Sequence, residues 1–417
     1  MRTLSVLFIS AALGAGAVGA AIGIGPDSPP AVAQQESERR TGPDSARVAL
    51  LLDALGRTDP LVCELIADQI GNFWSDGERA GVGRFVAVSP ALRAAKDSIG
   101  GQIRDPRAID RLVAELNASN ACVRRVAGKL LGNSAVAPAR LRGLFGDASS
   151  TIREAAAYAA GVGESPELRA PLESMLRDRD PAVAAMAAWA LGEIEDRASV
   201  PALLTALRSS EPRLRLAAIW ALGQLEDTRA VREIIPALRD GDASIRAMAA
   251  DVLGDLEDAS AVAPLERALA DDAAARVRVA AAESLGELSA RSSADALGRA
   301  LSDADIGVRR AAAGALGDLD DLDVAPQGLV AALRSSDVEL RRNAATALGE
   351  IADPATTPAL VGLLSDTSRE IRKQAAEALG EIGTPDAVRG LTRALEDRDP
   401  EVRRAAVEAL AEAKEDN

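Results

Sequence analysis

The sequence predicts an all-α fold, an α-solenoid (superhelix) of stacked helix pairs. A Leu-Gly pair recurs about every thirty-one residues, an aliphatic residue stands nine positions before its glycine, and a second apolar helical pattern follows it. A fixed period of this length is typical of repeated supersecondary units, because each unit buries its apolar face only against its neighbours.

The recurring pair defines the register of the units. From Gly192 onward the closing glycines are 31 or 32 residues apart, Ala160-Gly161 fills an earlier position, and Leu410-Ala411 ends the series. We expect each glycine to end the first helix of its unit. The pairs are Leu131-Gly132, Leu191-Gly192, Leu222-Gly223, Leu253-Gly254, Leu285-Gly286, Leu316-Gly317, Leu348-Gly349 and Leu379-Gly380.

The first helix of each unit carries apolar residues at i, i+4 and i+8, as in Val183, Ala187 and Leu191. This stripe is typical of an amphipathic helix. Apolar residues at i, i+3 and i+7 after the glycine, as in Val200, Leu203 and Leu207, predict a second helix. Residues 46–417 accommodate about twelve such pairs. Residues 46–134 hold degenerate N-terminal repeats, and residues 135–417 hold regular repeats with a C-terminal cap.

The N-terminal segment predicts export. Residues 4–25 are uncharged and follow a basic start, and Ala31-Val32-Ala33 supplies a cleavage site. Residues 1–33 are therefore interpreted as a signal peptide and residues 34–45 as a linker. An uncleaved membrane anchor is the alternative, since the uncharged stretch is long enough to span a bilayer. Both interpretations place the rest of the chain outside the cytoplasm, in the periplasm or secreted.

The chain is acidic, with a formal net charge of −15. A nucleic-acid partner is disfavoured, because such binding depends on basic surface that neutralises phosphates. Cys63 and Cys122 fall in helices two repeats apart, about 20 Å from each other if neighbouring helices pack about 10 Å apart. We therefore expect buried thiols; a disulfide would require the intervening degenerate repeat to deform.

Units of the type Asp-Pro-x-Val-Arg-x-Ala-Ala, clearest at residues 399–406, resemble the short, alanine-rich HEAT-like repeats of bacteria. The resemblance covers nearly all of the chain after the leader and implies about twelve HEAT-like helix pairs that act mainly as an interaction scaffold. An arginine lies eight residues before most closing glycines, and an acidic residue often lies twelve before. We interpret both rows as architecture: each arginine pairs with a nearby helix-start carboxylate, and Asp180 and Asp399 act as N-caps.

The chain contains no histidine, which excludes Ser-His-Asp and Cys-His catalysis and His-ligated zinc. HEAT-like repeats also build iron-dependent hydroxylases, whose His-Glu ligands are missing here, and bilin lyases, which nothing beyond the shared repeat supports. Acidic doublets such as Glu195-Asp196 and Asp320-Asp321 follow closing glycines. They are expected to be solvated turns, with a divalent-cation role along that edge as the alternative. We expect no enzyme, no cofactor and no metal site.

One feature departs from the repeat pattern. Tyr158, Trp189 and Trp220 stand three residues before the closing glycine in three consecutive units, where most units carry small or polar residues. This position lies about 200° around the helix from the core stripe. We expect the rings to be exposed on the concave side, which the corresponding helix lines in HEAT-like arrays. Leu216 and Ala185 share this face, and we predict that the five residues bind a partner. The alternative is that the rings are core.

Further along the same face the predicted character is charged. Arg310, Arg342, Lys373 and Arg404 lie seven residues before their closing positions, and a glutamate follows the last two at i+4. Solvated intrahelical ion pairs are expected there.

These observations together predict an exported, non-catalytic scaffold that binds a protein or peptide partner on its concave face. A periplasmic sensory or ligand-binding module that takes a peptide or glycan is the alternative, and a HEAT-like lyase-type enzyme is the third reading. Membrane contact is expected only if the N-terminal segment stays attached.

Overall fold

The computed structural model describes residues 44–57, 103–319 and 322–415. All of them belong to one compact unit, Asp44–Asn417. The predicted signal peptide (1–33), nearly all of the linker (34–45) and Cys63 lie outside the described residues. Within those ranges the chain is helical, apart from turns and one isolated bridge between Ile103 and Ser134. No described helix is long and apolar enough to cross a membrane.

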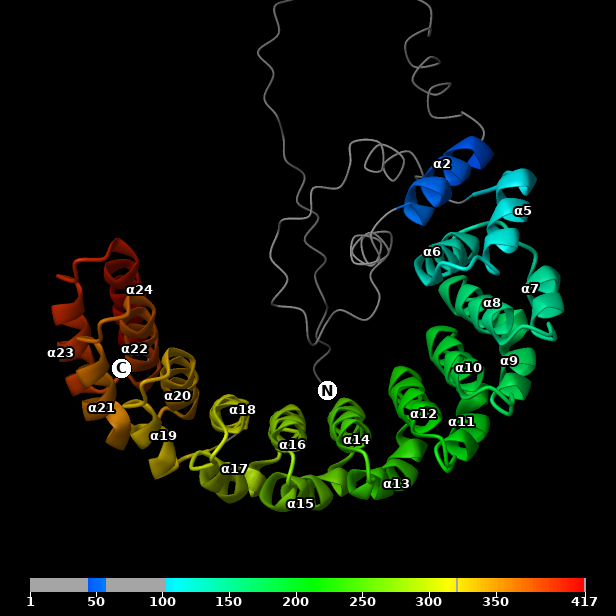
Figure 1. Cartoon of the computed structure of the whole chain (residues 1–417). Helices are drawn as coiled ribbons and strands as arrows, with labels where there is room; N and C mark the ends of the chain where they lie inside the picture. The colour runs from blue at the N-terminus through cyan, green and yellow to red at the C-terminus, as the bar shows by residue number, and fades with distance from the viewer. Residues whose placement is uncertain (1–43, 58–102, 320–321, 416–417) are drawn as a thin grey trace, which may run out of the picture. The chain divides into compact units, whose positions relative to one another are not determined.

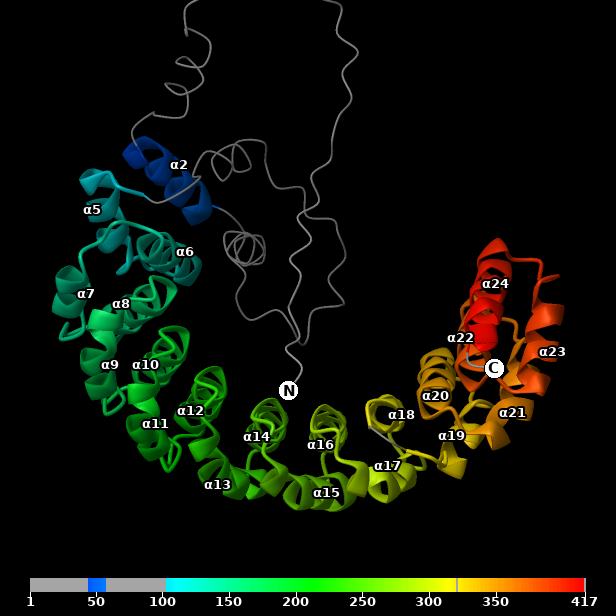
Figure 2. The ribbon, with the colours of Figure 1, turned by 180° about the vertical axis from the view of Figure 1, so that it is seen from behind.

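The predicted all-α solenoid is confirmed. Ten helix pairs follow one another along an arc of the described residues, with one row of helices on the concave side and one on the convex side (Figures 1 and 2). The inner row comprises α6 (Ala121–Gly132), α8 (Ser150–Val162), α10 (Pro181–Glu193), α12 (Pro212–Gln224), α14 (Ala243–Asp255), α16 (Ala275–Glu287), α18 (Ile306–Gly317), α20 (Val338–Ile351), α22 (Arg369–Ile382) and α24 (Pro400–Glu415).

The outer row is built of shorter helices. These are α5 (Pro106–Glu115), α7 (Pro138–Leu144), α9 (Arg169–Met175), α11 (Val200–Ala206), α13 (Val231–Ile234), α15 (Val262–Asp271), α17 (Ala294–Ala300), α19 (Gln327–Ala332), α21 (Thr357–Leu363) and α23 (Pro385–Ala394). Short 3-10 helices precede or extend several of them: η1 (Pro166–Leu168), η2 (Arg197–Ser199), η3 (Thr228–Ala230), η4 (Ile235–Arg239), η5 (Ala259–Ala261), η6 (Arg291–Ser293) and η7 (Pro354–Thr356).

Helix starts follow the sequence closely. The Asp180 carboxylate accepts a hydrogen bond from the Ala182 N–H, and Asp399 accepts one from the Glu401 N–H, so both act as the predicted N-caps. The proline after each aspartate begins the helix, where its missing N–H costs nothing. A second set of aspartates, after the inner helices, caps the 3-10 helices in the same way.

The closing glycine ends the helix in α6 and α18, but most inner helices run past it, so the expectation that it is the general helix stop was wrong. Gly192 lies inside the last turn of α10, which runs to Glu193. The left-handed residue that ends the helix comes three residues after the glycine, and it is usually not glycine: Glu195 has φ 54° and Glu226 has φ 45°. Gly383 is the one glycine with a positive φ among the described residues.

The closing glycine instead makes room for the next inner helix. An ideal β-carbon on Gly161 would lie 2.7 Å from Cζ3 of Trp189 and 3.0 Å from Cα of Ala190. The alanines predicted to allow close approach, such as Ala187 and Ala218, are fully buried. Small residues on the inner row bring these helices close together, which bends the array toward that side.

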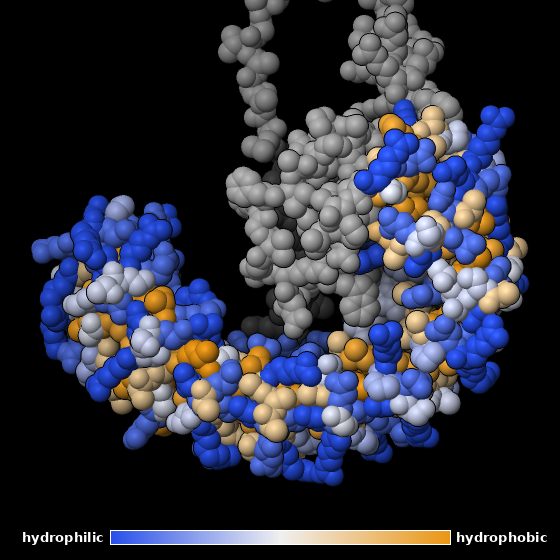
Figure 3. Space-filling model, viewed as in Figure 1, coloured by the Kyte–Doolittle hydropathy of each residue, from blue (hydrophilic) through white to orange (hydrophobic). Residues whose placement is uncertain are grey.

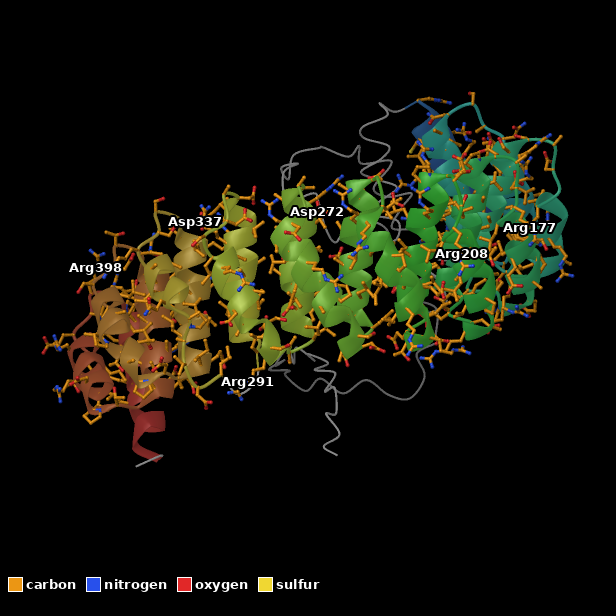
Figure 4. All side chains as sticks on the ribbon, turned by 90° about the horizontal axis from the view of Figure 1, so that it is seen from below. Arg177, Arg208, Asp272, Arg291, Asp337 and Arg398 are labelled. Atoms are coloured by element: carbon orange, nitrogen blue, oxygen red, sulfur yellow. The ribbon has the colours of Figure 1, made fainter. Side chains whose placement is uncertain are left out.

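An arginine ladder joins successive units along one edge. The Arg153 guanidinium donates to both carboxylate oxygens of Asp178 and to the carbonyl oxygen of Asp147. The partner is therefore an aspartate of the next unit, two residues before its N-cap, and not the helix-start carboxylate that we expected. The same rung recurs as Arg215–Asp240, Arg246–Asp272, Arg278–Asp303, Arg341–Asp366 and Arg372–Asp397. Figure 4 shows Asp272 and Asp337 on the edge opposite Arg291.

The N-terminal part departs from even stacking. Helix α2 (Asp44–Gly56) packs directly on α5 and α6, although residues 58–102 intervene in the chain. Cys122, at the start of α6, is disulfide-bonded. The expectation of a buried thiol was therefore wrong for Cys122, because it assumed one evenly spaced unit for every thirty-one residues of this part.

Candidate functional site

The inner helices line the concave side, as the sequence predicted for the glycine-closed helix of each unit (Figure 1). Only a narrow strip of each inner helix stays in contact with water. In α10 the residues from Ala187 to Gly192 are all buried, whereas Ala185 and Met186 are half-exposed. The strip that a partner can reach therefore consists mainly of the positions six and seven residues before the closing glycine and the position after it. In α14 and α16 it also includes the position three before the glycine, where Asp251 and Glu283 are exposed.

The predicted aromatic ridge is not an exposed surface. Only 7% of Tyr158 and 2% of Trp189 is accessible, and Trp220 is half-buried. The ring centroids of Tyr158 and Trp189 lie 5.2 Å apart, and those of Trp189 and Trp220 lie 6.3 Å apart, with both pairs stacked. The expectation that these rings face solvent was wrong for Tyr158 and Trp189, whereas Trp220 keeps part of its surface accessible.

The rings are buried because small residues on the preceding inner helix, such as the closing glycine, leave space for them. The indole rings of Trp189 and Trp220 lie over Gly161 and Gly192 of the preceding helix, and the Tyr158 ring lies over Gly128 of α6. A position on the outward side of an isolated helix is thus covered once large side chains can reach the neighbouring helix. The side chains of Leu216 and Ala185 are half-exposed, and their part in binding a partner stays a prediction.

A small cavity of about 320 Å³ lies beside Tyr158, between α6, α8 and α10. Its described lining combines Arg124, Glu154 and Met186 with the edge of the tyrosine. Burial raises the pKa of Glu154, with the charge of Asp180 as the second cause. The mixture of both charges and apolar atoms does not identify a ligand chemistry.

The inner strip of α14, α16 and α18 carries carboxylates instead of rings. Five exposed acidic side chains gather there: Asp251, Asp255, Glu283, Glu287 and Asp318. We call this set the acidic band. No ion pair or hydrogen bond to these carboxylates is found within the described ranges.

Partial burial and mutual repulsion perturb the acidic band. Burial, and then the negative charges of neighbouring carboxylates led by Glu283, raises the pKa of Asp251 to about 7. Burial also raises the pKa of Glu287, with the charge of Asp255 as the next cause. The inner side of these helices therefore holds negative charge that the described residues do not compensate.

The described acidic doublets lie in turns, as expected, although Asp227 is buried instead of solvated. Glu195 and Glu226 hold the left-handed turn, while Asp196 and Asp227 accept hydrogen bonds from backbone N–H groups two residues on. Among the residues that the structure describes, no group of three or more potential ligands could hold a metal ion. Asp320-Asp321 lies outside those residues.

The C-terminal inner helices neutralise their own charge. Lys373 pairs with Glu377 at 2.9 Å and Arg404 with Glu408 at 3.5 Å, which confirms the predicted intrahelical pairs. Arg310 instead reaches across to Asp337 of the next inner helix. Two hollows open on this face: about 480 Å³ between α16, α18 and α20, and about 310 Å³ between α20, α22 and α24.

Sequence reasoning missed the acidic band. At the position three before the glycine only the aromatic residues were singled out for binding, and no role was predicted for the position directly after it. The detectable signal was the coincidence of acids at both positions in consecutive units, at Asp251 with Asp255 and at Glu283 with Glu287. Figure 3 shows hydrophilic side chains over most of the outer margin of the arc, with apolar residues scattered among them.

The sequence profile of the HEAT repeats family matches residues 137–213, 200–286, 268–327 and 326–411. No curated protein sequence matches the chain. Among solved structures, one of Kap95p bound to RanGDP is 14% identical with a TM-score of 0.52, covering 86% of this chain and 55% of that one.

Two further solved structures resemble the chain less closely in shape. An engineered protein is 22% identical with a TM-score of 0.45, covering 73% of this chain and 98% of that one. Importin beta is 15% identical with a TM-score of 0.49, covering 92% and 53%. The chain thus spans about half the length of the Kap95p and importin beta chains.

Proposed function

Because the chain belongs to the HEAT repeats family, which covers residues 137–411, we propose that it is a non-catalytic scaffold that binds a protein partner on its concave face. The observation that carries this proposal is the pair of hollows along the inner strip, from α16 to α24. They lie side by side on consecutive helices, so an extended protein surface can contact several units together. The shared fold of Kap95p, which binds RanGDP, is consistent with this role.

Export belongs to the same proposal. The uncharged N-terminal segment and its small-residue site support a periplasmic or secreted scaffold. The absence of histidine from the whole sequence supports a role without the catalytic groups that depend on imidazole.

The proposal is tested by blocking the concave face. Gly314→Arg and Thr346→Arg together place two long side chains in the inner strip, where the nearest atom to a Gly314 β-carbon is 3.9 Å away. The matched control is Gly362→Arg with Thr205→Arg on the outer helices α21 and α11. Both glycines have room for a β-carbon, and both threonine hydroxyls donate to the carbonyl four residues before.

The unmodified chain should capture a stoichiometric protein from envelope extract, and the control variant should capture the same protein. The inner-face variant should lose it while keeping its helical circular dichroism signal. Equal capture by both variants would overturn the concave-face proposal. If the chain captures no protein but a small molecule raises its thermal unfolding midpoint, the ligand-binding alternative is favoured instead.

A further inference from the structure

We propose that the acidic band and the apolar strip beside it dock a lysine- or arginine-rich segment of the protein partner. This inference rests on the proposed scaffold function and adds the chemistry of the partner. It applies to the inner faces of α14, α16 and α18.

The first observation is a missing set of counter-charges. In α18, α20, α22 and α24 the position seven residues before the closing position carries a cation, as Lys373 and Arg404 show. In α22 and α24 the cation pairs with a glutamate one helical turn later: Lys373 with Glu377, and Arg404 with Glu408. In α14 and α16 the same position holds Ala247 and Val279. Asp251 and Glu283 therefore lack the lysine or arginine that later units place one turn away.

The second observation is the apolar strip that replaces those cations. Leu216, Ala247 and Val279 occupy equivalent positions on α12, α14 and α16, and all three are half-exposed. The strip runs beside the carboxylates of Asp251 and Glu283. Lysine and arginine combine an aliphatic stem with a charged end, so their side chains match an apolar strip bordered by acids.

The third observation is the shape of the surface. The hollow of about 480 Å³ has Val279, Ala311 and Ala315 in its lining, together with the carboxylates of Glu283, Glu287 and Asp318. Arg310 also lines it, but its guanidinium is paired with Asp337 and Glu339 and not with the acidic band. The aliphatic part of a lysine or arginine side chain can therefore lie along the apolar lining of the hollow, while the charged end lies next to the carboxylates. The Gly314 backbone, which carries no side chain, keeps the hollow open between α16 and α18.

Electrostatics favour a cationic occupant over the alternatives. A guanidinium or ammonium group would relieve the repulsion among carboxylates that already raise one another's pKa. The described part of the chain offers no cluster suited to a metal ion, and an acidic strip repels a nucleic-acid backbone. A basic protein segment is the occupant that also uses the apolar strip.

The test uses the full chain and a peptide of ten lysines as the probe, with a peptide of ten glutamates as its counterpart. The band variant is Asp251→Asn/Glu283→Gln/Glu287→Gln. The matched control is Asp271→Asn/Asp295→Asn/Glu396→Gln, which removes the same charge from exposed carboxylates outside the inner row. Binding is measured by isothermal titration at low salt, where electrostatic association is strongest.

The band variant should bind the lysine peptide about tenfold more weakly, and the control should change by less than about twofold. The glutamate peptide should not bind. Equal weakening by the two variants would show that the peptide follows net charge alone, and no weakening by either would show that it binds elsewhere. Both outcomes overturn the inference.

A second variant keeps every carboxylate. Ala247→Lys with Val279→Lys supplies the cations of the later units, so it should weaken the lysine peptide as strongly as the band variant does. Unchanged binding would overturn the inference. If the Gly314→Arg/Thr346→Arg variant loses the captured protein while the band variant still binds the lysine peptide normally, the scaffold proposal stands and only the basic-segment inference falls.

Discussion

The ring of Trp220 occupies the space where a side chain on Gly192 would begin: an ideal β-carbon there would lie 2.7 Å from Cζ3 of the indole and 2.9 Å from Cα of Ala221. The glycine and the aromatic ring belong to consecutive inner helices, 28 residues apart. Their contact is one of the places where the spacing between units is set.

We expect Gly192→Ala to lower the free energy of unfolding by about 2 kcal/mol, because the added methyl group overpacks a contact that includes backbone. Urea unfolding followed by circular dichroism measures the change. Gly362→Ala is the control, since no atom lies within 4 Å of its β-carbon position and alanine favours a helix by up to about 1 kcal/mol. Equal effects of the two substitutions would contradict this account of the closing glycine.

Trp189→Ala should lower the free energy of unfolding by about 3–5 kcal/mol, as expected for truncating a large buried ring. The ring is 2% exposed and stacks on Tyr158 and Trp220. Val324→Ala, at a side chain that is 73% exposed, should change stability by less than about 0.5 kcal/mol. A tryptophan variant as stable as the parent would restore the interpretation of an exposed ridge.

Breaking a rung of the arginine ladder should cost more than breaking a surface pair. Asp272→Asn removes the negative charge from the pair with Arg246, whose guanidinium donates hydrogen bonds of 2.6 and 2.9 Å to the two carboxylate oxygens. The side chains of Arg246 and Asp272 are 15% and 8% exposed. We expect a loss of about 2 kcal/mol. Glu233→Gln, in the exposed pair with Arg208, should cost less than about 0.5 kcal/mol. Chemical denaturation of both variants gives the comparison.

Glu226→Gly should stabilise the array by about 0.5 kcal/mol. The φ of Glu226, 45°, is unfavourable for a residue with a side chain, and glycine removes this strain. Part of the gain in stability is lost because glycine has more conformational entropy in the unfolded chain. Glu350→Gly, inside α20, should instead destabilise by up to about 1 kcal/mol. The thermal midpoints should therefore shift in opposite directions; a loss at both positions would argue against strain at the turn.

Stability should rise as the pH falls from 8 toward 5. The pKa of Asp251 is about 7 in the folded chain and near 3.8 in the unfolded chain, so the folded chain binds more protons between those values. Asp251→Asn should be about 1 kcal/mol more stable than the parent at pH 8, after allowance for solvent screening of an exposed group. The advantage should shrink toward pH 5.

Asp337→Asn provides the opposite control for that titration. Hydrogen bonds from Arg310 lower the pKa of Asp337 to about 2, so its contribution is present at neutral pH and lost as the pH falls from about 4 through 2. The variant should be less stable than the parent at pH 7. An Asp251→Asn difference that stays constant from pH 8 to pH 5 would rule out titration of this group.

Local pattern was enough to predict the helices. The aliphatic residues at i, i+4 and i+8 and the Asp-Pro starts identified the inner helices, the outer row and the caps at Asp180 and Asp399. These features depend on neighbouring residues only, which is why a single sequence reveals them. The i+4 pairs of Lys373 and Arg404 were predictable for the same reason.

The sequence by itself determined the all-α class, the thirty-one-residue unit and the stacking of helix pairs, because periodic burial follows from residue spacing. Only the tertiary structure decided which side chains of the inner strip stay wet. Trp189 reaches a glycine 28 residues earlier and is covered, whereas Asp251 and Glu283 stay exposed without a cation one turn away. The exposure of a side chain in a solenoid depends on the side chains of the neighbouring helices. The residue pattern of one helix alone therefore cannot predict it.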